Sequence, residues 1–357
     1  MKENIFLIAL HSIWISQKKL SYIFKDTENY RSYFENINHD RLKQAWIRID
    51  LATKILERKN KIDINFLQKV IDEKKVTIIS KKDSRYPSSL FQIANPPYIL
   101  YVRWKLDERP CFSIVGSRII SSYGEKAIER IVPVLGKYFS IVSGWAAWCD
   151  TKAHRESVTS NIKTIVVVWT GIDVVYPTGN RKLYEEIIEK WWAILSIFPI
   201  GEVGNPYNFP IRNEIISWLA VWTLVVEAKV KSWSLITAQL CLDLWKDLFA
   251  IPGDVYKSGS SGCNMLIKKW EAKLTTWPMD ILEEYNFSAD INLEEKQKNF
   301  SDPLEQKIYN IISIESLNSN EISHKIELDI NSTLKTISKL ELQWIIKTSL
   351  GWKYEIS

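Results

Sequence analysis

Apolar positions near the two ends of the chain recur with a helical spacing of about 3.6 residues. Near the amino end the pattern predicts helices over Ile5–Leu10, Lys18–Phe24 and Leu42–Leu56. Near the carboxyl end it predicts three more helices and two short strands around a Leu350-Gly351-Trp352 turn, namely Leu304–Ile312, Ser319–Ile326, Ser332–Leu340, Trp344–Lys347 and Tyr354–Ile356. Three helices followed by two strands are typical of a winged-helix domain.

The middle of the chain alternates between short apolar runs and polar or helical stretches. Six runs rich in Val and Ile are predicted strands: Phe112–Val115, Ser140–Val142, Thr164–Val168, Ala193–Phe198, Thr223–Val226 and Leu248–Ile251. Continuous apolar runs between helices indicate a parallel sheet that is covered on both faces. The predicted fold class is therefore α/β, a Rossmann-like doubly wound and mostly parallel sheet. Such sheets bind ligands beyond the carboxyl ends of their strands.

The same patterns divide the chain into four segments. Residues 1–66 are a small helical domain, either a helix–hairpin–helix (SAM-like) module turning at Trp14-Ile15-Ser16 or a plain helical cap. Residues 67–285 form the Rossmann-like core, and 303–357 form the winged-helix domain. Residues 286–302 are polar and lack periodicity, so they are interpreted as a linker.

The cysteine content, the length of the apolar runs and the net charge limit what class of protein this is. No apolar run approaches the roughly 18–20 residues that span a bilayer, and the amino end does not resemble a secretory signal, so we expect a cytoplasmic protein without membrane contact. Four scattered Cys and four isolated His favour a reduced compartment and argue against a disulfide framework or a metal site. The net charge of +5 permits a polyanionic partner. Residues 303–357 carry six basic and seven acidic side chains, which argues against strong DNA binding there.

The content of Trp and Gly is abnormal. The chain has 16 Trp and only 12 Gly, where average usage of about 7% predicts roughly 25 Gly. Trp233 opens a helix in a small-polar loop, and Trp245 lies between a helical run and a strand, both places where turns favour glycine. We hypothesise that a codon meaning glycine in the source, with UGA as the candidate, is translated here as Trp. The alternative is that these residues are genuine aromatics, some of them stacking on a ligand.

The loop after the first core strand has the chemistry of a phosphate site. Gly116, Ser117 and Arg118 bring together backbone N–H groups, a hydroxyl and a guanidinium. Ser121 and Ser122 occupy the later positions of a G-x-G-x-x-G fingerprint, and no G-x-x-x-x-G-K-[ST] run occurs, so neither a dinucleotide site nor a P-loop is expected.

The loop after the second core strand combines small residues with an acid and a histidine. Gly144 lets another chain segment approach the backbone closely, whereas Asp150 caps the following helix or contacts His154 one turn later. Because no nucleophile is spaced to use this pair, Asp150 and His154 are expected to be structural, and no catalytic residue is assigned.

Later loops supply further polar and basic side chains. They contain Phe209, Arg212 and Asn213, then Lys231, Ser232 and Ser234, and finally Asn264. Arg118, Arg212 and Lys231 are expected to line one electropositive strip at the strand ends, with solvated surface charges as the alternative. Phe209 is expected to stack on a base.

An ordered series of these motifs resembles the DNA-processing protein A family (DprA, also called Smf) across about residues 67–285. The motifs are Gly116-Ser117-Arg118, Ser143-Gly144 with Asp150 and His154, Tyr176-Pro177, Phe209-Pro210 with Arg212-Asn213, Glu227-Ala228, Lys231-Ser232 with Ser234–Ala238, Ile251-Pro252-Gly253, and Gly262 with Asn264. Several Trp stand where that family usually has glycine: Trp104, Trp148, Trp169, Trp218, Trp233, Trp245 and Trp270.

The resemblance implies a homodimeric, single-stranded DNA-binding protein that protects incoming DNA and loads the RecA recombinase in natural transformation, without a cofactor and without turnover. It implies DNA-binding roles for Gly116, Ser117, Arg118, Gly144, Phe209, Arg212, Asn213, Lys231, Ser232, Ser234 and Asn264. The chain departs from the family pattern at Ala147, Ile197, Ile211 and Glu214, and these departures imply weaker binding or a shifted DNA path.

Two enzymatic alternatives remain for this sheet. One is a phosphoribohydrolase acting on nucleoside monophosphates, but the loop Ser232–Thr237 is followed by Ala238 and Gln239 and lacks the carboxylate that hydrolysis needs. The other is a dinucleotide oxidoreductase, which the missing glycine fingerprint disfavours.

Overall fold

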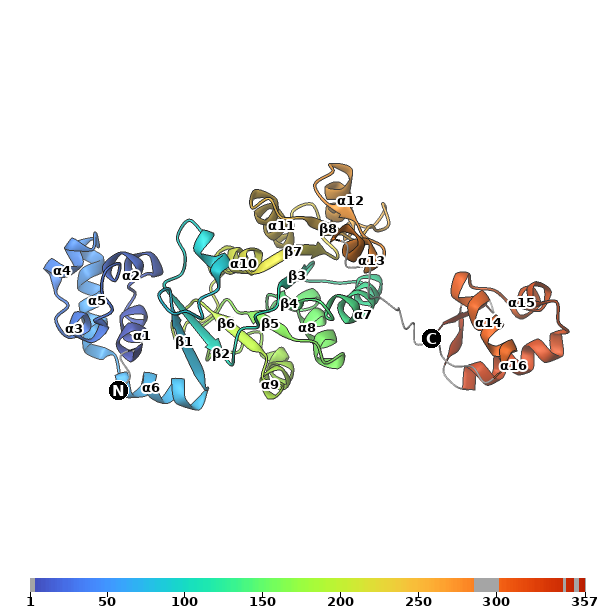
Figure 1. Ribbon diagram of the computed structural model, residues 1–357, viewed down its shortest axis with the longest axis horizontal. Helices are drawn as coiled ribbons and strands as arrows, with labels where there is room; N and C mark the ends of the chain where they lie inside the picture. The colour runs from blue at the N-terminus through green and yellow to red at the C-terminus, as the bar shows by residue number, and fades with distance from the viewer. Residues whose placement is uncertain (1–3, 286–301, 343–344, 350–352, 357) are drawn as a thin grey trace. The chain divides into compact units, whose positions relative to one another are not determined.

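The computed structural model describes residues 4–285, 302–342, 345–349 and 353–356. The chain divides into two compact units, residues 1–286 and 287–357 (Figure 1). The predicted linker lies outside the described residues except for Asp302, as do Trp344 and the Leu350-Gly351-Trp352 turn. Within the described ranges, no helix is long and apolar enough to cross a membrane.

All six predicted core strands are present. They are β3 (Cys111–Val115), β4 (Ser140–Ser143), β5 (Thr164–Val167), β6 (Ala193–Ser196), β7 (Ala220–Val225) and β8 (Leu248–Ala250). They run in the order β6-β5-β4-β3-β7-β8, and every neighbouring pair among them is parallel. The α/β, mostly parallel fold class is therefore confirmed. Their side chains are almost all buried, which explains why the strands appear in the sequence as continuous apolar runs.

Three further strands extend this sheet to nine strands. At one edge, β1 (Val76–Ser80) and β2 (Ile99–Arg103) pair antiparallel, and β2 is also antiparallel to β6. At the other edge, β9 (Lys273–Leu274) is parallel to β8. The sequence pattern did not predict these strands. β1 directly follows a helix, with almost no turn between the two elements. β9 has only two residues, which are too few to show an alternation of apolar and polar positions.

Helices cover both faces of the sheet, as a doubly wound fold requires. On one side lie α7 (Ser122–Leu135), α8 (Cys149–Thr159) and α9 (Arg181–Glu189). On the other side lie α10 (Asn208–Leu219), α11 (Trp233–Asp243) and α12 (Ser261–Lys268) (Figure 1). Short elements complete the core: η1 (Ser88–Gln92), η2 (Thr178–Asn180), α13 (Met279–Leu282) and η3 (Glu283–Tyr285).

The described part of the amino-terminal segment, from residue 4 onward, contains six helices. They are α1 (Asn4–Ser12), α2 (Gln17–Ile23), α3 (Tyr30–Glu35), α4 (His39–Gln44), α5 (Ile49–Lys61) and α6 (Ile64–Glu73). The single helix predicted over Leu42–Leu56 is wrong, because the chain turns between α4 and α5, where Trp46 adopts φ 57°. α6 runs across residue 66, so the predicted domain boundary falls inside a helix.

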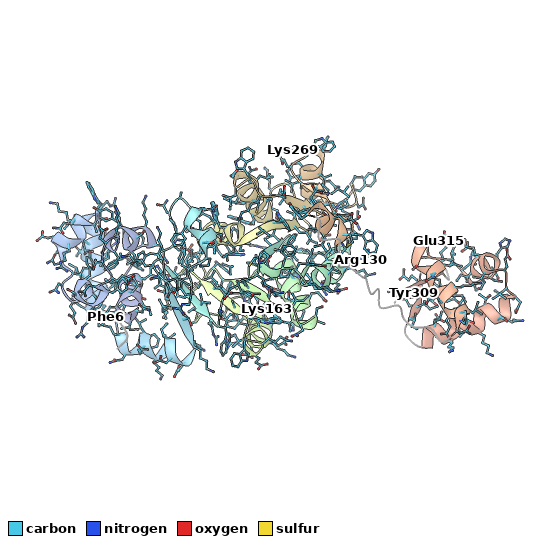
Figure 2. The ribbon with its side chains drawn as sticks, viewed as in Figure 1. Phe6, Arg130, Lys163, Lys269, Tyr309 and Glu315 are labelled. Carbon is cyan, nitrogen blue, oxygen red and sulfur yellow. The ribbon has the colours of Figure 1, made fainter. Side chains whose placement is uncertain are left out.

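The amino-terminal helices share one hydrophobic core with the sheet. Phe6 of α1, labelled in Figure 2, packs on Phe34 of α3 with ring centroids 5.8 Å apart. Gln17 fixes these helices to the sheet, because its Nε2 donates to the carbonyls of Ile99 (3.0 Å) and Ile197 (2.8 Å) and its Oε1 accepts from the Ile99 N–H (2.9 Å). This explains why residues 1–66 and the sheet belong to one compact unit.

The second unit has the predicted order of elements. α14 (Pro303–Ile314), α15 (Ser319–Ile326) and α16 (Ile330–Leu342) precede an antiparallel pair, β10 (Ile346–Ser349) and β11 (Lys353–Ile356). Its small core includes Ile308, Ile322, Leu340 and Ile346. The assignment as a winged-helix domain stays a prediction.

Candidate nucleic-acid interface

The strand order places a topological switch point between β3 and β7. From β3 the chain proceeds through β4, β5 and β6 on one side, and then returns to β7 on the other side of β3. The loops that leave β3 and β7 therefore begin next to each other at the carboxyl ends of adjacent strands. Ligands of open α/β sheets bind at such points.

A single acidic residue holds the loop that follows β3. The Ser117 N–H donates to the Glu227 carbonyl (2.7 Å), while the Ser121 N–H and hydroxyl donate to the two carboxylate oxygens of Glu227 (2.8 and 2.5 Å). Ser121 also caps α7. Arg118, between the two serines, is exposed. The loop is thus tied at both ends to Glu227, just beyond the end of β7, while Arg118 stays exposed between them.

Aromatic rings gather beside Arg118. Its guanidinium carbon lies 4.7 Å from the ring centroid of Phe209, at the start of α10. Trp169 stacks on the same ring with a centroid distance of 4.1 Å, and Trp233 lies 6.1 Å away. The ring that was expected to stack on a base is therefore half-buried among protein side chains in this chain.

The loop after β7 also carries exposed positive charge. Lys231 is exposed in a turn closed by the hydrogen bond from the Ser232 N–H to the Lys229 carbonyl (3.0 Å). Ser232 caps α11 by accepting from the Ser234 N–H, and the two hydroxyls lie 2.7 Å apart. Ser234 itself is buried, so Lys231 and the half-buried Ser232 are the accessible members of this group.

Arg212 does not join Arg118 and Lys231 in an exposed strip, and the expectation of one strip containing all three is wrong. Its side chain is buried, and its Nη1 lies 3.6 Å from Oδ2 of the buried Asp150. Burial raises the pKa of the Asp150 carboxyl, and Arg212 partly opposes this shift. An arginine inside a protein needs such a partner, and its position on the inner face of α10 was not evident from sequence spacing.

Gly144 allows this buried pair to form. A Cβ at Gly144 would lie 1.4 Å from Arg212 Nη1, so only glycine fits. The predicted contact between Asp150 and His154 is not what the structure shows. His154 Nε2 donates to the Gly144 carbonyl (2.8 Å), and its Nδ1 pairs with the Thr164 hydroxyl (2.7 Å). Asp150 instead accepts from the Ala146 N–H (3.1 Å).

The remaining predicted site residues, Gly116, Asn213 and Asn264, are buried or half-buried. Gly116 leaves room for Cys149, whose Sγ would be 2.6 Å from a Cβ there. Asn264 brackets Gly253 after β8, accepting from its N–H (3.1 Å) and donating to its carbonyl (2.9 Å). Asn213 is buried on α10.

Two residues at the strand ends were missed by the sequence reasoning as members of the site. Glu227 was noted only as part of a motif, although an acid at the end of a strand in a basic region was a signal. Lys229 is exposed two residues before Lys231, and the Lys229-Val230-Lys231 run was the signal for it.

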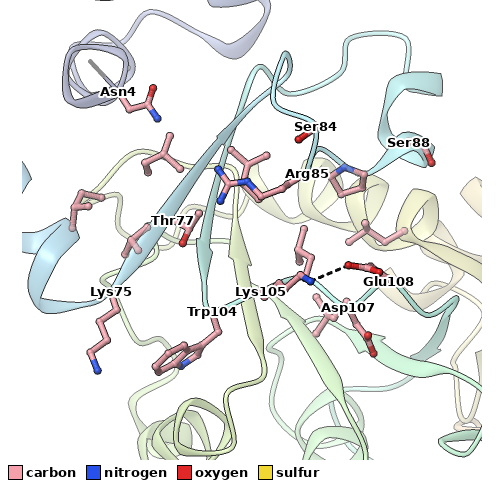
Figure 3. Close-up of a pocket in the computed structure, with 18 of the residues that line it drawn as sticks. Asn4, Lys75, Thr77, Ser84, Arg85, Ser88, Trp104, Lys105, Asp107 and Glu108 are labelled. Carbon is pink, nitrogen blue, oxygen red and sulfur yellow. Dashed lines mark hydrogen bonds and ion pairs between the residues drawn. The ribbon is translucent and has the colours of Figure 1, made fainter. Parts of the chain in front are cut away.

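A large cavity lies elsewhere in the core. It has a volume of about 1230 Å³ and lies beside the β1–β2 edge, where α1, the end of α6 and the segment before β3 also line it (Figure 3). Lys75 contacts the ring of Trp104 there (5.3 Å), and Lys105 pairs with Glu108 (2.9 Å). Residues 104–111 lead into the amino end of β3, so this cavity is distinct from the loops at the carboxyl ends.

Nucleophilic and metal chemistry find little support in the described residues. Burial raises the pKa of Cys111 and of Cys263 to about 12, and it raises the pKa of Cys149 well above its ordinary value, so these thiols stay protonated. Across the described ranges, no group of three or more His, Cys, Asp and Glu side chains is placed to hold a metal ion.

Sequence comparison connects this geometry to known proteins. The sequence model of DNA recombination-mediator protein A matches residues 77–286. The DNA processing protein DprA of Streptococcus pneumoniae is 38% identical over 234 residues, covering 65% of this chain and 82% of the relative. Protein Smf of Escherichia coli is 34% identical over 226 residues, covering 62% of this chain and 60% of the relative, so the chain spans less than two thirds of that protein.

Solved structures agree with the fold. The X-ray structure of DNA processing protein A from Streptococcus pneumoniae aligns with a TM-score of 0.67 and 32% identity, covering 79% of this chain and 97% of the other. The same protein from Helicobacter pylori, solved to describe its single-stranded DNA binding mode, aligns with a TM-score of 0.53 and 24% identity, covering 59% of this chain and 95% of the other.

Proposed function

Because the chain belongs to the DNA recombination-mediator protein A family, we propose that it binds single-stranded DNA at the carboxyl ends of β3 and β7. The observation that carries the proposal is the placement of three exposed cations beside the switch point: Arg118 on the loop after β3, and Lys229 and Lys231 on the loop after β7. Phosphates attract such cations regardless of base sequence, so the DNA would cross the sheet end with its backbone along these loops.

The proposed contacts divide into two groups by burial. Direct contacts come from accessible or half-buried side chains, namely Ser117, Arg118, Phe209, Lys231 and Ser232. Supporting roles fall to Gly116, Gly144, Arg212, Asn213, Ser234 and Asn264, which shape the loops or fill the space beneath them. Phe209 would contribute most if its neighbour Trp169 moved away from its ring, because base stacking needs a free aromatic face.

The family also supports a wider role. We propose that the protein acts as a homodimer in the cytoplasm, protects incoming single strands and loads a RecA-type recombinase during transformation, without turnover chemistry. Glu227 supports the non-enzymatic role, because its two carboxylate oxygens both accept from Ser121 and are therefore engaged in holding a loop. The phosphoribohydrolase alternative would need a carboxylate available to a substrate.

Binding of fluorescently labelled oligonucleotides tests the proposal. We expect single strands to bind more tightly than duplex of equal length, with little sequence preference and an affinity that falls steeply with salt. Release of ribose phosphate from nucleotides serves as the parallel assay for the enzymatic alternative. Equal affinity for duplex, or an affinity that does not change with salt, would refute the proposed site.

A further inference from the structure

The loop that carries Arg118 is held by one buried carboxylate. Glu227 is buried, with 7% of its surface exposed, and it receives both hydrogen-bond donors of Ser121. Its own carbonyl accepts the Ser117 N–H. The five-residue loop 117–121 is therefore anchored at its first and last residues to a single residue at the end of β7.

This arrangement is unexpected on electrostatic grounds. A negative charge next to a phosphate-binding loop weakens the attraction for DNA, so charge alone would favour a neutral side chain there. The geometry offers the opposite benefit, because a loop tied at both ends loses little conformational freedom when Arg118 engages a phosphate. We propose that Glu227 is a positioning residue for Arg118, a role that rests on the proposed function.

The test compares Glu227→Gln with Arg118→Ala in oligothymidine titrations over a range of salt. Glutamine removes the charge and replaces one of the two acceptor oxygens that face Ser121 by an amide nitrogen, which only donates. We expect affinity to fall about five- to tenfold and the salt dependence to decrease by the amount seen for Arg118→Ala, about 0.7 in the logarithmic slope per phosphate lost. The double variant should bind no more weakly than Arg118→Ala alone.

Matched controls separate positioning from charge and from unfolding. Glu202→Gln, in the loop after β6, removes the same charge without touching Ser121, so it should leave binding equal or slightly tighter. If Glu227→Gln does not fold, Ser121→Gly decides the question, because it deletes the hydroxyl bond and keeps a residue that helix N-caps tolerate. If the folded variant binds oligothymidine with the affinity and the salt dependence of the wild type, the positioning role is overturned. Failure of the parent chain to bind oligothymidine overturns the proposed function instead.

A second inference comes from backbone conformation and does not depend on the binding site. Five helices end in the same way, with Trp at the first position beyond the cap and in a left-handed conformation. The residues are Trp14 (φ 76°), Trp46 (57°), Trp191 (63°), Trp245 (56°) and Trp270 (61°), after α1, α4, α9, α11 and α12. Two backbone bonds close each end: after α12, the Trp270 N–H donates to Ile267 and the Glu271 N–H to Leu266, both at 3.0 Å. This is the Schellman motif, whose left-handed position is usually glycine.

At the last two of these positions, tryptophan gains little. The Trp245 and Trp270 side chains are 96% and 95% exposed, so their rings bury almost no apolar surface to offset the left-handed strain. Figure 2 places Lys269, the residue before Trp270, at the outer end of α12. Within the described ranges, Trp accounts for seven of the ten non-glycine residues with positive φ, since Trp104 and Trp148 also adopt it.

We infer that the natural residue at these five helix ends is glycine, and that the codon written here as Trp is decoded as glycine in the source organism. The 16 Trp and 12 Gly together number 28, close to the roughly 25 expected of an average chain of this length. The inference applies first to the five positions where the backbone itself requires a residue without a Cβ clash.

Peptide mass spectrometry of the protein from its natural source tests the inference directly. Glycine is expected in the peptides that contain positions 245 and 270, together with one shared codon for all five helix ends in the coding DNA. Tryptophan at those two positions overturns it.

Stability of the recombinant chain gives a second measurement. Trp245→Gly and Trp270→Gly should each raise the ratio of folded to unfolded protein about fivefold, because the left-handed strain disappears. Trp277→Gly is the control: this Trp is half-exposed and does not have positive φ, and it contacts Arg130, so its removal should bring no gain. A loss of stability at both helix ends would contradict the inference.

Discussion

Arg212 Nη1 lies 3.6 Å from Asp150 Oδ2, and both side chains are buried beneath the loops at the strand ends. The pair links α10 to the start of α8, on opposite faces of the sheet, near its carboxyl edge. It thereby connects the two helical layers at the place where the proposed DNA path crosses. Arg212 Nε has no hydrogen-bond partner in the described part of the chain, so Asp150 is its main compensation.

Arg212→Ala should therefore act on stability before it acts on DNA. Removing one partner leaves an uncompensated buried charge, and we expect the free energy of unfolding to fall by about 3–5 kcal/mol, measured by urea denaturation. The double variant Asp150→Leu with Arg212→Met should recover much of this loss. A fully stable Arg212→Ala protein with weakened DNA binding would show instead that the guanidinium contacts DNA.

Gly144→Ala should disturb the same pair from the backbone side. The new Cβ would overlap Arg212 Nη1, and overpacking of this kind costs about 1–3 kcal/mol. Gly179→Ala is the matched control, because a Cβ there meets nothing within 4 Å. Urea denaturation of the two variants should separate them clearly, and equal stability would mean that Arg212 can move aside without loss.

The buried histidines should make the protein less stable in mild acid. Burial lowers the pKa of His154 to about 4 and that of His11 to about 3, whereas both would titrate near 6.5 when unfolded. The unfolded chain therefore binds more protons than the folded chain as the pH falls below about 6.5. Between about pH 7.5 and about pH 5, each histidine should lower the free energy of unfolding by about 2 kcal/mol. Replacing His154 by Gln should remove the contribution of that histidine and leave that of His11. Urea midpoints measured at several pH values would show the difference.

Deletion of residues 303–357 should leave single-strand affinity within about threefold, a change below about 1 kcal/mol. The reason is charge: that segment carries one more acidic than basic side chain and offers little attraction for phosphates. Oligonucleotide titration is the measurement, with circular dichroism as the control for folding of residues 1–302. If the truncated protein folds but its affinity for single strands falls more than about tenfold, this segment binds DNA.

The sequence was sufficient to predict the parallel sheet. Strands buried on both faces must be apolar throughout, and the six core strands from β3 to β8 therefore appear as separate apolar runs. It also located the chemistry, because parallel strands carry their following loops to one edge. The sequence alone therefore assigns Gly116, Arg118 and Lys231 to that edge.

The tertiary structure alone decided which of these side chains face solvent. Arg212 and Arg118 are the same residue type and both follow a core strand, yet Arg212 is buried against Asp150 and Arg118 is exposed, because packing sets the rotation of α10 against the sheet. Glu227 became part of the site for the same reason: its partner Ser121 is 106 residues away, and only the pairing of β3 with β7 brings the two together. Residue spacing records local periodicity, whereas contacts across the sheet depend on strand order and register.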